Sequence, residues 1–512
     1  MGSPGWFLVP EILCFVPKPL RVPPTRAKIK RMNTLLVGLL LSAGGLAAAD
    51  FVGIWAGAIT HEGRSTPYAL ELESAGEGQV SVRLSIPVIH VLRQPIGERP
   101  LVVEGDQVKL GSSTVFTYDA AAGTLSGVIP EGLAPLYKLP VTLKRVPTLE
   151  LPSRPEIDAP MAKPVWTFDA GAALWSGATL SGGTVYVGAE DGRLIALDAR
   201  TGRERWTFRA GGPLRARATV AEDAVYVPSD DGFVYRLDAT TGTERWRARV
   251  QETRVERLPF DDPGSRFDRF GSEVAVAGGR LYVGTHDGHL VALEAGSGAR
   301  VWDFAGAESV LAAPAVDAGR VYFGGYDGNV YALEASSGIL LWQRDTGKPV
   351  VSTPAVSGDR LVVGSRSYDL FGLDATTGAI AWRHYLWFSW VESSPTLRDG
   401  VAYVGSSDGA IVAAHDTRTG RQLWATDVWG WAWGQPAVTE SRVYLGTCGM
   451  GDYLAPHRGG VVAMDRATGR PAWRFAPEKT DAKTYGFPGS PAAGAGLVFV
   501  TDLQGTVYAF AE

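Results

Sequence analysis

A pattern of eleven residues recurs seven times between residues 196 and 473. The first copy reads ALDARTGRERW and ends at Trp206, and the fifth reads GLDATTGAIAW and ends at Trp382. The tryptophans that end successive copies are 40, 56, 40, 40, 42 and 49 residues apart. Self-similarity at this period predicts a chain built from stacked repeats, each too small to bury its apolar side chains alone.

Each repeat reads as four short strands. In the fourth, LAAPAV is an inner strand, RVYFGG the second, NVYALEA the third and ILLWQRD the outer one. Gly-containing turns such as Asp327-Gly328 connect them, as expected for antiparallel neighbours. Short strands at even spacing with one aromatic signature per unit predict an all-β fold, a β-propeller.

The two ends of the array give the number of blades. Trp166 lies in PVWTF with no inner strands before it, and the last unit, residues 488–511, stops after its third strand. The strand around Trp166 is therefore expected to complete the last blade. This predicts an eight-bladed propeller over residues 164–512, a closed ring without a free sheet edge.

The repeated pattern, A-x-D-x-x-T-G-x-x-x-W, resembles the tryptophan-docking motif of the PQQ-like (quinoprotein dehydrogenase) propeller superfamily. Ala196, Asp198, Thr201, Gly202 and Trp206 carry it in the first copy. The Asp and Thr side chains are expected to satisfy backbone groups of a turn, Gly to take a positive φ, and Trp to lie flat on that turn between blades. We therefore assign a structural docking role to Trp166, Trp206, Trp246, Trp302, Trp342, Trp382, Trp424 and Trp473.

The N-terminal region reads as a targeting segment. Residues 26–49 place a basic run before an apolar stretch and a small-residue end at Ala47 and Ala49. This predicts a cleaved signal peptide over residues 32–49, starting at Met32, with residues 1–31 as a mis-started extension. An N-terminal membrane anchor is the alternative, but the apolar stretch is short for a bilayer span. The prediction places the protein in the periplasm or outside the cell, with no transmembrane segment in the mature chain.

Residues 50–146 predict a separate small antiparallel β-barrel or sandwich, because YALELESAGEGQVSVRLSI alternates apolar and polar residues around a Gly-containing turn. The opening DFVGIWAG, with Gly53 and Trp55, resembles the lipocalin-like β-module that precedes some secreted hydrolases. A Trp55 that plugs one end of the barrel is favoured over a ligand-binding Trp55. The Pro-rich residues 147–163 read as a stiff linker.

Charge and cysteine content exclude several classes of function. Formal net charge is −5, and without residues 1–49 the chain carries 43 basic and 53 acidic residues. An acidic surface repels phosphate backbones, so we expect no nucleic-acid partner. Cys448 is the only cysteine after Cys14, which excludes an intrachain disulfide in the mature protein.

One face of the ring is expected to carry the function. Loops between second and third strands and loops between blades emerge on the same face, and the irregular segments, residues 251–270, 447–460 and 476–487, fall there. Two blade-to-blade loops on this face hold the aromatic residues Trp387, Phe388, Trp390, Trp429, Trp431 and Trp433. Such rings stack on a planar cofactor, a sugar or a partner's side chains. The favoured alternative is that they pack on one another and cap the ring.

Polar residues interrupt inner strands that otherwise begin with small side chains. They are Arg215, Arg217, Glu273, Glu392, Trp433 and Gln435. All share one parity relative to the following strand, so they are expected to face the same channel. Opposite charges there either bind a polar ligand or pair with each other, and pairing is commoner.

The remaining histidines, aspartates and Cys448 are weaker candidates for metal binding or reactivity. His286 and His289 flank an Asp-Gly turn, which favours turn chemistry over metal binding. Asp261, Asp262 and Asp268 read as a solvated loop without calcium-loop spacing, and no sequence feature activates the Cys448 thiol. No Ser-His-Asp elbow, HExxH or phosphate-binding Gly loop is present, so we assign no catalytic or metal-ligating residue.

Three functions remain open. The first is a non-enzymatic binding scaffold with an envelope or extracellular protein partner; the chain is similar to the propeller subunit of the outer-membrane β-barrel assembly machinery, although it lacks a lipidation Cys. The second is a PQQ- and Ca²⁺-dependent dehydrogenase. Enzymes of that superfamily stack PQQ between a Trp and a vicinal disulfide and hold Ca²⁺ with acidic and amide side chains; this chain has no vicinal Cys pair. The third is polysaccharide binding by an exposed Trp face. We favour the first, a protein that is not an enzyme. If the chain is an enzyme, the resemblance implies a PQQ-dependent oxidoreductase.

Overall fold

The computed structural model of the protein describes residues 46–76, 78–129, 137–154, 156–255, 270–450, 455, 457–477 and 484–512. The chain divides into two compact units, Met1–Pro152 and Ser153–Glu512. In the described ranges the regular elements are strands and two short 3₁₀ turns, Ala48–Phe51 and Pro87–Ile89. The all-β prediction is therefore confirmed.

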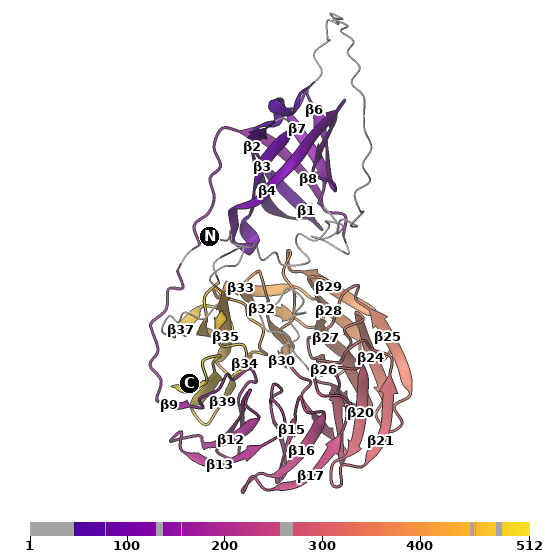
Figure 1. The fold of residues 1–512 in the computed structure, drawn as a ribbon, viewed down its shortest axis with the longest axis vertical. Coiled ribbons are helices and arrows are strands. Elements are labelled where there is room, and N and C mark those ends of the chain that lie inside the picture. The colour runs from indigo at the N-terminus through magenta and orange to yellow at the C-terminus, as the bar shows by residue number, and fades with distance from the viewer. Residues whose placement is uncertain are drawn as a thin grey trace, which may run out of the picture. The chain divides into compact units, whose positions relative to one another are not determined.

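The first unit is a closed barrel of eight strands (Figure 1). The strands are β1 Gly53–His61, β2 Arg64–Gly76, β3 Gln79–Ile86, β4 Val91–Glu104, β5 Gln107–Leu110, β6 Thr114–Asp119, β7 Thr124–Val128 and β8 Pro140–Val146. Consecutive strands are antiparallel, and β1 pairs with β8 to close the barrel. Trp55 is 2% exposed, and its Nε1 donates to the Phe51 carbonyl oxygen at 2.8 Å. This packing suits the structural reading of Trp55, while the lipocalin-like resemblance stays a prediction.

The second unit contains eight sheets arranged as the blades of a propeller (Figure 1). Blade 1 comprises β10 Thr179–Ser181, β11 Thr184–Gly188, β12 Arg193–Asp198 and β13 Glu204–Arg209, and blade 2 comprises β14 Thr219–Ala221, β15 Ala224–Pro228, β16 Phe233–Asp238 and β17 Glu244–Arg249. Blade 3 comprises β18 Ala275–Ala277, β19 Arg280–Gly284, β20 His289–Glu294 and β21 Arg300–Ala305, and blade 4 comprises β22 Ala315–Asp317, β23 Arg320–Gly324, β24 Asn329–Glu334 and β25 Leu340–Asp345.

Blade 5 comprises β26 Ala355–Ser357, β27 Arg360–Gly364, β28 Asp369–Asp374 and β29 Ile380–Tyr385, and blade 6 comprises β30 Thr396–Arg398, β31 Val401–Gly405, β32 Ile411–Asp416 and β33 Gln422–Asp427. Blade 7 comprises β34 Ala437–Val438, β35 Arg442–Met450, β36 Gly460–Asp465 and β37 Pro471–Phe475, and blade 8 comprises β39 Ala492–Gly494, β40 Leu497–Thr501, β41 Thr506–Ala511 and β9 Trp166–Asp169. In blade 7, β38 Thr484–Gly486 also pairs with β35.

The ring closes as the truncated ends of the array predict. Ala509 of β41 pairs with Trp166 of β9, so the first propeller strand supplies the outer strand of blade 8. The inner strand of every blade contacts the inner strands of both neighbours, including β39 with β10. Eight blades are therefore confirmed. Between adjacent blades the facing sheets bury apolar side chains, such as Tyr322 and Val330 against Leu361 and Phe371.

The repeated tryptophans join neighbouring blades. Trp342 Nε1 donates to the Ala375 carbonyl oxygen of the next blade at 3.2 Å. Its ring lies over Gly378, where an added Cβ would meet the indole at 2.5 Å and where φ is +68°. Asp374 Oδ1 accepts from the backbone N–H and hydroxyl of Thr377 and holds this turn. Equivalent indole hydrogen bonds are made by Trp166, Trp206, Trp246, Trp302, Trp382 and Trp424.

Trp473 packs differently because blade 8 has no copy of the turn. Its ring lies against Phe510, with centroids 5.3 Å apart. The eighth contact between blades thus relies on aromatic packing instead of an indole hydrogen bond to a glycine turn.

Part of the Pro-rich segment is fastened to the propeller. Ala162 N–H donates to the Arg474 carbonyl oxygen at 2.8 Å, and Arg474 N–H donates to that of Pro160 at 3.0 Å. This short parallel pairing covers the outer edge of blade 7. Ile157 packs against the apolar cluster between blades 6 and 7. Residues 154 and 156–163, which we call the strap, therefore belong with the propeller before β9 begins.

Candidate functional site

One residue from each blade faces the axis of the propeller. Each lies two positions before the inner strand begins, which places equivalent side chains at equivalent heights. We call this the inner ring: Gly177, Arg217, Glu273, Ala313, Thr353, Ser394, Gln435 and Ser490. Because side chains alternate along an extended chain, the residues two positions earlier face the same way. In blades 2 to 8 they form an outer ring of Arg215, Gly271, Leu311, Val351, Glu392, Trp433 and Pro488.

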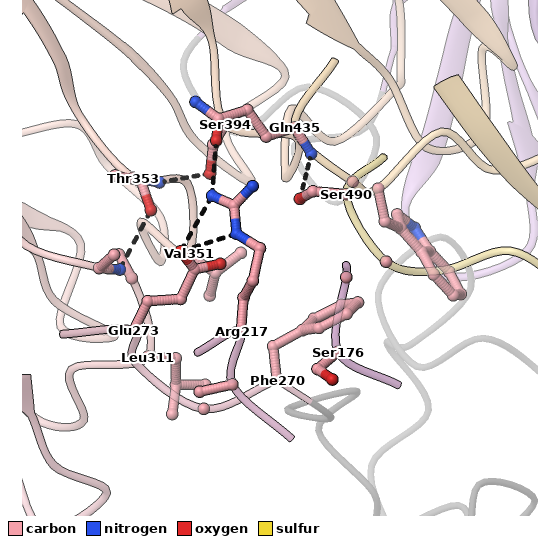
Figure 2. Close-up of a pocket in the computed structure, with 18 of the residues that line it drawn as sticks. Ser176, Arg217, Phe270, Glu273, Leu311, Val351, Thr353, Ser394, Gln435 and Ser490 are labelled. Carbon is pink, nitrogen blue, oxygen red and sulfur yellow. Dashed lines mark hydrogen bonds and ion pairs between the residues drawn. The ribbon is translucent and has the colours of Figure 1, made fainter. Parts of the chain in front are cut away.

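These residues line a single pocket of about 860 Å³, part of which is open to solvent (Figure 2). The chain enters each inner strand from a blade-to-blade loop, so the outer ring lies nearer the loop-rich face. All six polar or aromatic residues that break the inner-strand pattern line this pocket: Arg215, Arg217, Glu273, Glu392, Trp433 and Gln435. Their shared parity is the signal that groups them.

Arg217 crosses the pocket. Its Nε and Nη2 donate to Glu273 Oε2 at 3.1 and 3.0 Å, and Nη2 also donates to Gln435 Oε1 at 3.0 Å (Figure 2). Glu273 belongs to the neighbouring blade, but Gln435 lies 218 residues away in blade 7. The guanidinium is therefore held between a carboxylate and an amide oxygen from different parts of the ring. The Arg217 and Glu273 side chains are 24% and 29% exposed, so this pair faces the cavity.

A second ion pair lies deeper in the wall. Arg366 Nη2 contacts Glu392 Oε1 at 2.6 Å, and their side chains are 6% and 12% exposed. The Arg366 guanidinium also stacks over the Trp390 ring at 4.8 Å. Sequence reasoning named Glu392 and missed Arg366. The available signal was the SRSYD sequence of residues 365–369, where most other blades have an Asp-Gly turn.

Arg215 is also paired with acids. Its side chain is 8% exposed, contacts Glu190 and lies 3.6 Å from Asp230 Oδ2. Its guanidinium carbon is 5.7 Å from the centre of the Trp175 ring. In this pocket the charged residues thus pair with one another, which leaves hydrogen-bonding edges facing the cavity and little net charge.

Trp433 brings an aromatic surface to the pocket. Its ring stacks on Trp431 with centroids 5.0 Å apart, and Trp431 stacks on His457 at 4.8 Å. The Trp433 Nε1 donates to Ser407 Oγ at 3.3 Å, which fixes the ring. Trp431 and Trp433 therefore point to the same side of the chain, as their alternation predicts.

Most members of the aromatic cluster are buried in the propeller. Trp390, Trp429 and Trp431 are 9%, 8% and 3% exposed, and Phe388 is completely buried. Trp429 is covered by Arg154 and Arg458, whose guanidinium carbons lie 4.2 and 3.9 Å from its ring centre. Trp387 is half-buried and packs on Tyr385 and Phe388. The rings are buried because they have partners within the propeller.

The weaker candidates that the structure describes pair with nearby residues. His289 Nδ1 lies 2.6 Å from Asp303 Oδ1, and His286 N–H donates to Gln251 Oε1 at 2.9 Å. Among the residues that the structure describes, no three His, Cys, Asp or Glu side chains come together as a metal site would require. Burial, with the charge of Asp502, raises the pKa of the Cys448 thiol. Asp261, Asp262 and Asp268 lie outside the described residues.

The sequence profile of one family covers the propeller. The family described as outer membrane protein assembly factor BamB matches residues 156–265, 234–384, 327–451 and 408–512. The chain belongs to this family. In the described ranges of this family member, no helix is both long and apolar enough to cross a membrane.

A curated relative bears a different activity in its name. The quinohemoprotein alcohol dehydrogenase of Comamonas testosteroni is 31% identical over 93 residues, which are 16% of this chain and 12% of the dehydrogenase. The chain thus spans about an eighth of that relative's length.

Solved structures with the same fold include both kinds of protein. BamB from Moraxella catarrhalis is 21% identical, covers 69% of this chain and 98% of its own, and gives a TM-score of 0.51. The Comamonas testosteroni dehydrogenase is 14% identical, covers 68% and 76%, and scores 0.52. The computationally designed Ika8 protein is 17% identical, covers 67% and 98%, and scores 0.55. The fold alone therefore does not separate binding from catalysis.

Proposed function

We propose that the protein is a non-enzymatic binding scaffold of the bacterial envelope, periplasmic or secreted, which takes part in the assembly of outer-membrane proteins. The BamB family profile spans residues 156–512 and supports this assignment. The binding region is the loop-rich face of the ring, with the axial pocket at its centre. Its partner is a protein, and the signal-peptide reading of residues 32–49 gives it access to that compartment.

The contacts of Arg217 support this proposal over a quinoprotein dehydrogenase. A Ca²⁺ site needs several oxygen ligands that are free to bind the ion. Here the Glu273 carboxylate and the Gln435 amide oxygen both accept hydrogen bonds from the Arg217 guanidinium. A built-in cation thus takes the place of a metal between the acidic and amide side chains of the pocket.

The remaining groups also fit PQQ poorly. The propeller has a single cysteine, Cys448, which is free and buried, so no disulfide platform is available. The residues present therefore weigh against PQQ as a ligand of this pocket.

A gene deletion tests the proposal in the organism that carries the gene. The deletion is expected to lower the amount of folded outer-membrane β-barrel proteins, measured by heat-modifiable migration and quantitative proteomics of the outer membrane. A plasmid copy of the full chain is expected to restore them. Unchanged outer-membrane proteins together with a lost PQQ-stimulated dye reduction in membrane extracts would contradict the scaffold and support the dehydrogenase.

A further inference from the structure

We propose that the axial pocket binds an uncharged sugar ring. This site goes beyond the scaffold function and does not depend on it, because it concerns a small ligand that the purified chain would bind alone. The proposal rests on the hydrogen-bonding groups that the inner ring leaves available, on the charge balance at Arg217, and on the aromatic and apolar surfaces of the outer ring.

Three hydroxyl groups of the inner ring keep a hydrogen to donate. Thr353 Oγ1, Ser394 Oγ and Ser490 Oγ each accept a backbone N–H from the preceding blade, at 3.1, 2.9 and 3.0 Å. A hydroxyl that accepts one hydrogen bond still has its own O–H and a second lone pair. Within the described part of the chain these O–H groups have no acceptor in the protein. Backbone hydrogen bonds thus hold the three hydroxyl oxygens in place, and a ligand in the cavity can use their remaining O–H and lone pair.

Arg217 and Glu273 add a donor next to an acceptor. Arg217 uses Nε and Nη2 in its bonds to Glu273 and Gln435, whereas its Nη1 makes no hydrogen bond to the residues that the structure describes. Glu273 accepts both hydrogen bonds on Oε2, so its Oε1 remains as an acceptor for a ligand. A ligand hydroxyl both donates and accepts, so it matches this edge and the nearby Ser and Thr hydroxyls.

The charge balance favours a neutral ligand. A carboxylate or phosphate would gain from Arg217 but would face the Glu273 oxygen within the same ion pair, and like charges at short range repel. An ammonium group would face the opposite conflict with Arg217. A polyhydroxyl ligand avoids both, because its groups need only donors and acceptors.

Non-polar surfaces of the pocket fit the faces of a sugar ring. Trp433 provides aromatic surface. Phe270 adds a second ring, and Leu311 and Val351 form an aliphatic wall in blades 4 and 5 (Figure 2). The C–H faces of a pyranose pack on such surfaces while its hydroxyls point to polar groups at the edge.

Calorimetric titration of the full-length chain tests the proposal, with tryptophan fluorescence as a second readout. The probes are D-glucose, D-galactose, D-mannose, N-acetyl-D-glucosamine, maltose and cellobiose, with D-glucuronate as the charged analogue. At least one neutral probe is expected to bind saturably and more tightly than D-glucuronate. No saturable binding of any neutral probe up to about 10 mM, ten times a roughly millimolar dissociation constant, would overturn the site.

Two variants connect the binding to the pocket. Ser394→Ala is expected to weaken the best neutral probe roughly tenfold, because a ligand hydroxyl loses its partner in a desolvated site. Ser441→Ala, an exposed serine in the turn between β34 and β35, is the matched control and is expected to change nothing. Equal affinity in wild type and Ser394→Ala would overturn the assignment.

Glu273→Gln gives a readout that a purely structural role would not produce. It keeps an oxygen for Arg217 but removes the neutralising charge, so the preference is expected to move from the neutral sugar towards D-glucuronate. Circular dichroism and the thermal midpoint verify that each variant is folded. An unchanged ratio of the two affinities in a folded variant would contradict the charge argument.

Discussion

Arg154 is joined to Asp427, 273 residues further along the chain, by two hydrogen bonds of 2.8 and 2.5 Å. The Arg154 side chain is 6% exposed, and its guanidinium covers the Trp429 ring. Arg458 covers the same ring and is itself held by Glu156 at 2.9 Å. One tryptophan and two ion pairs, Arg154–Asp427 and Arg458–Glu156, thus join the strap to the loops of blades 6 and 7. We call this set of contacts the clasp.

Breaking the clasp is expected to destabilise the propeller. Arg154→Met should lower the free energy of unfolding by about 2 kcal/mol, because it leaves the partly buried Asp427 carboxylate without its cation and removes one cation–π contact. Denaturant unfolding followed by tryptophan fluorescence measures the change. Arg300→Met, which breaks a more exposed ion pair with Asp303, should cost less than about 1 kcal/mol. Equal effects would contradict a special role for the strap.

The docking of tryptophan on glycine predicts a contrast between two glycines with positive φ. Gly378→Ala places a Cβ 2.5 Å from the Trp342 ring, whereas at Gly400 an added Cβ meets nothing within 4 Å. Their φ angles are +68° and +75°, so the backbone strain is similar. We expect Gly378→Ala to cost about 3 kcal/mol and Gly400→Ala about 1 kcal/mol of unfolding free energy. The same loss in both variants would mean that strain alone, and not the indole contact, fixes the glycine.

Acid should weaken the turns that receive these tryptophans. Hydrogen bonds from Arg205 and Thr201 lower the pKa of Asp198 to about 2, and those from Arg245 and Thr241 do the same for Asp238. The folded pKa lies below the ordinary value of 3.8, so the unfolded chain takes up protons first as the pH falls. The contribution of the two carboxylates to the free energy of unfolding is therefore complete above about pH 5 and is lost as the pH falls towards 2.

Thermal unfolding between pH 5 and pH 2 measures this dependence. The thermal midpoint should fall across the interval, and the fall should be smaller in an Asp198→Asn, Asp238→Asn double variant, which starts from a lower midpoint. The prediction is wrong if wild type and double variant lose stability in parallel.

Cys448 should be unreactive in the folded protein. The side chain is completely buried, and burial raises the pKa of its thiol, so little nucleophilic thiolate forms. In a Cys14→Ser variant, where Cys448 is the only thiol, Ellman's reagent at pH 8 should release no colour until denaturant is added. Rapid reaction of one thiol in the native state would contradict this burial.

The large-scale fold can be predicted from the sequence because each repeat carries the same strand pattern. The spacing of the tryptophans and the missing outer strand of residues 488–511 together imply eight blades and closure by Trp166. The pocket residues could be grouped for the same reason: their common parity before each inner strand survives in the structure.

Partners across the ring were beyond this reasoning. The Arg217–Gln435 hydrogen bond joins blades 2 and 7, and repeat periodicity contains no information on which side chain reaches across the axis. The contacts of the strap could not be predicted for a related reason. The Pro-rich composition of residues 147–163 is typical of a linker, and it does not indicate that Arg154 has a charged partner in a distant blade. Clustered tryptophans likewise do not indicate which of them receive a covering residue.

Cofactor titration of the full-length chain tests the central claim most directly. PQQ and Ca²⁺ are added together, and tryptophan quenching and dye reduction with simple alcohols are followed in wild type and in Arg217→Gln. Because Arg217 holds the Glu273 and Gln435 oxygens, we expect no saturable quenching and no turnover in wild type, and a Ca²⁺-dependent rise in thermal midpoint only in the variant. Saturable PQQ binding with dye reduction by wild type would contradict the account and make the axial pocket an active site.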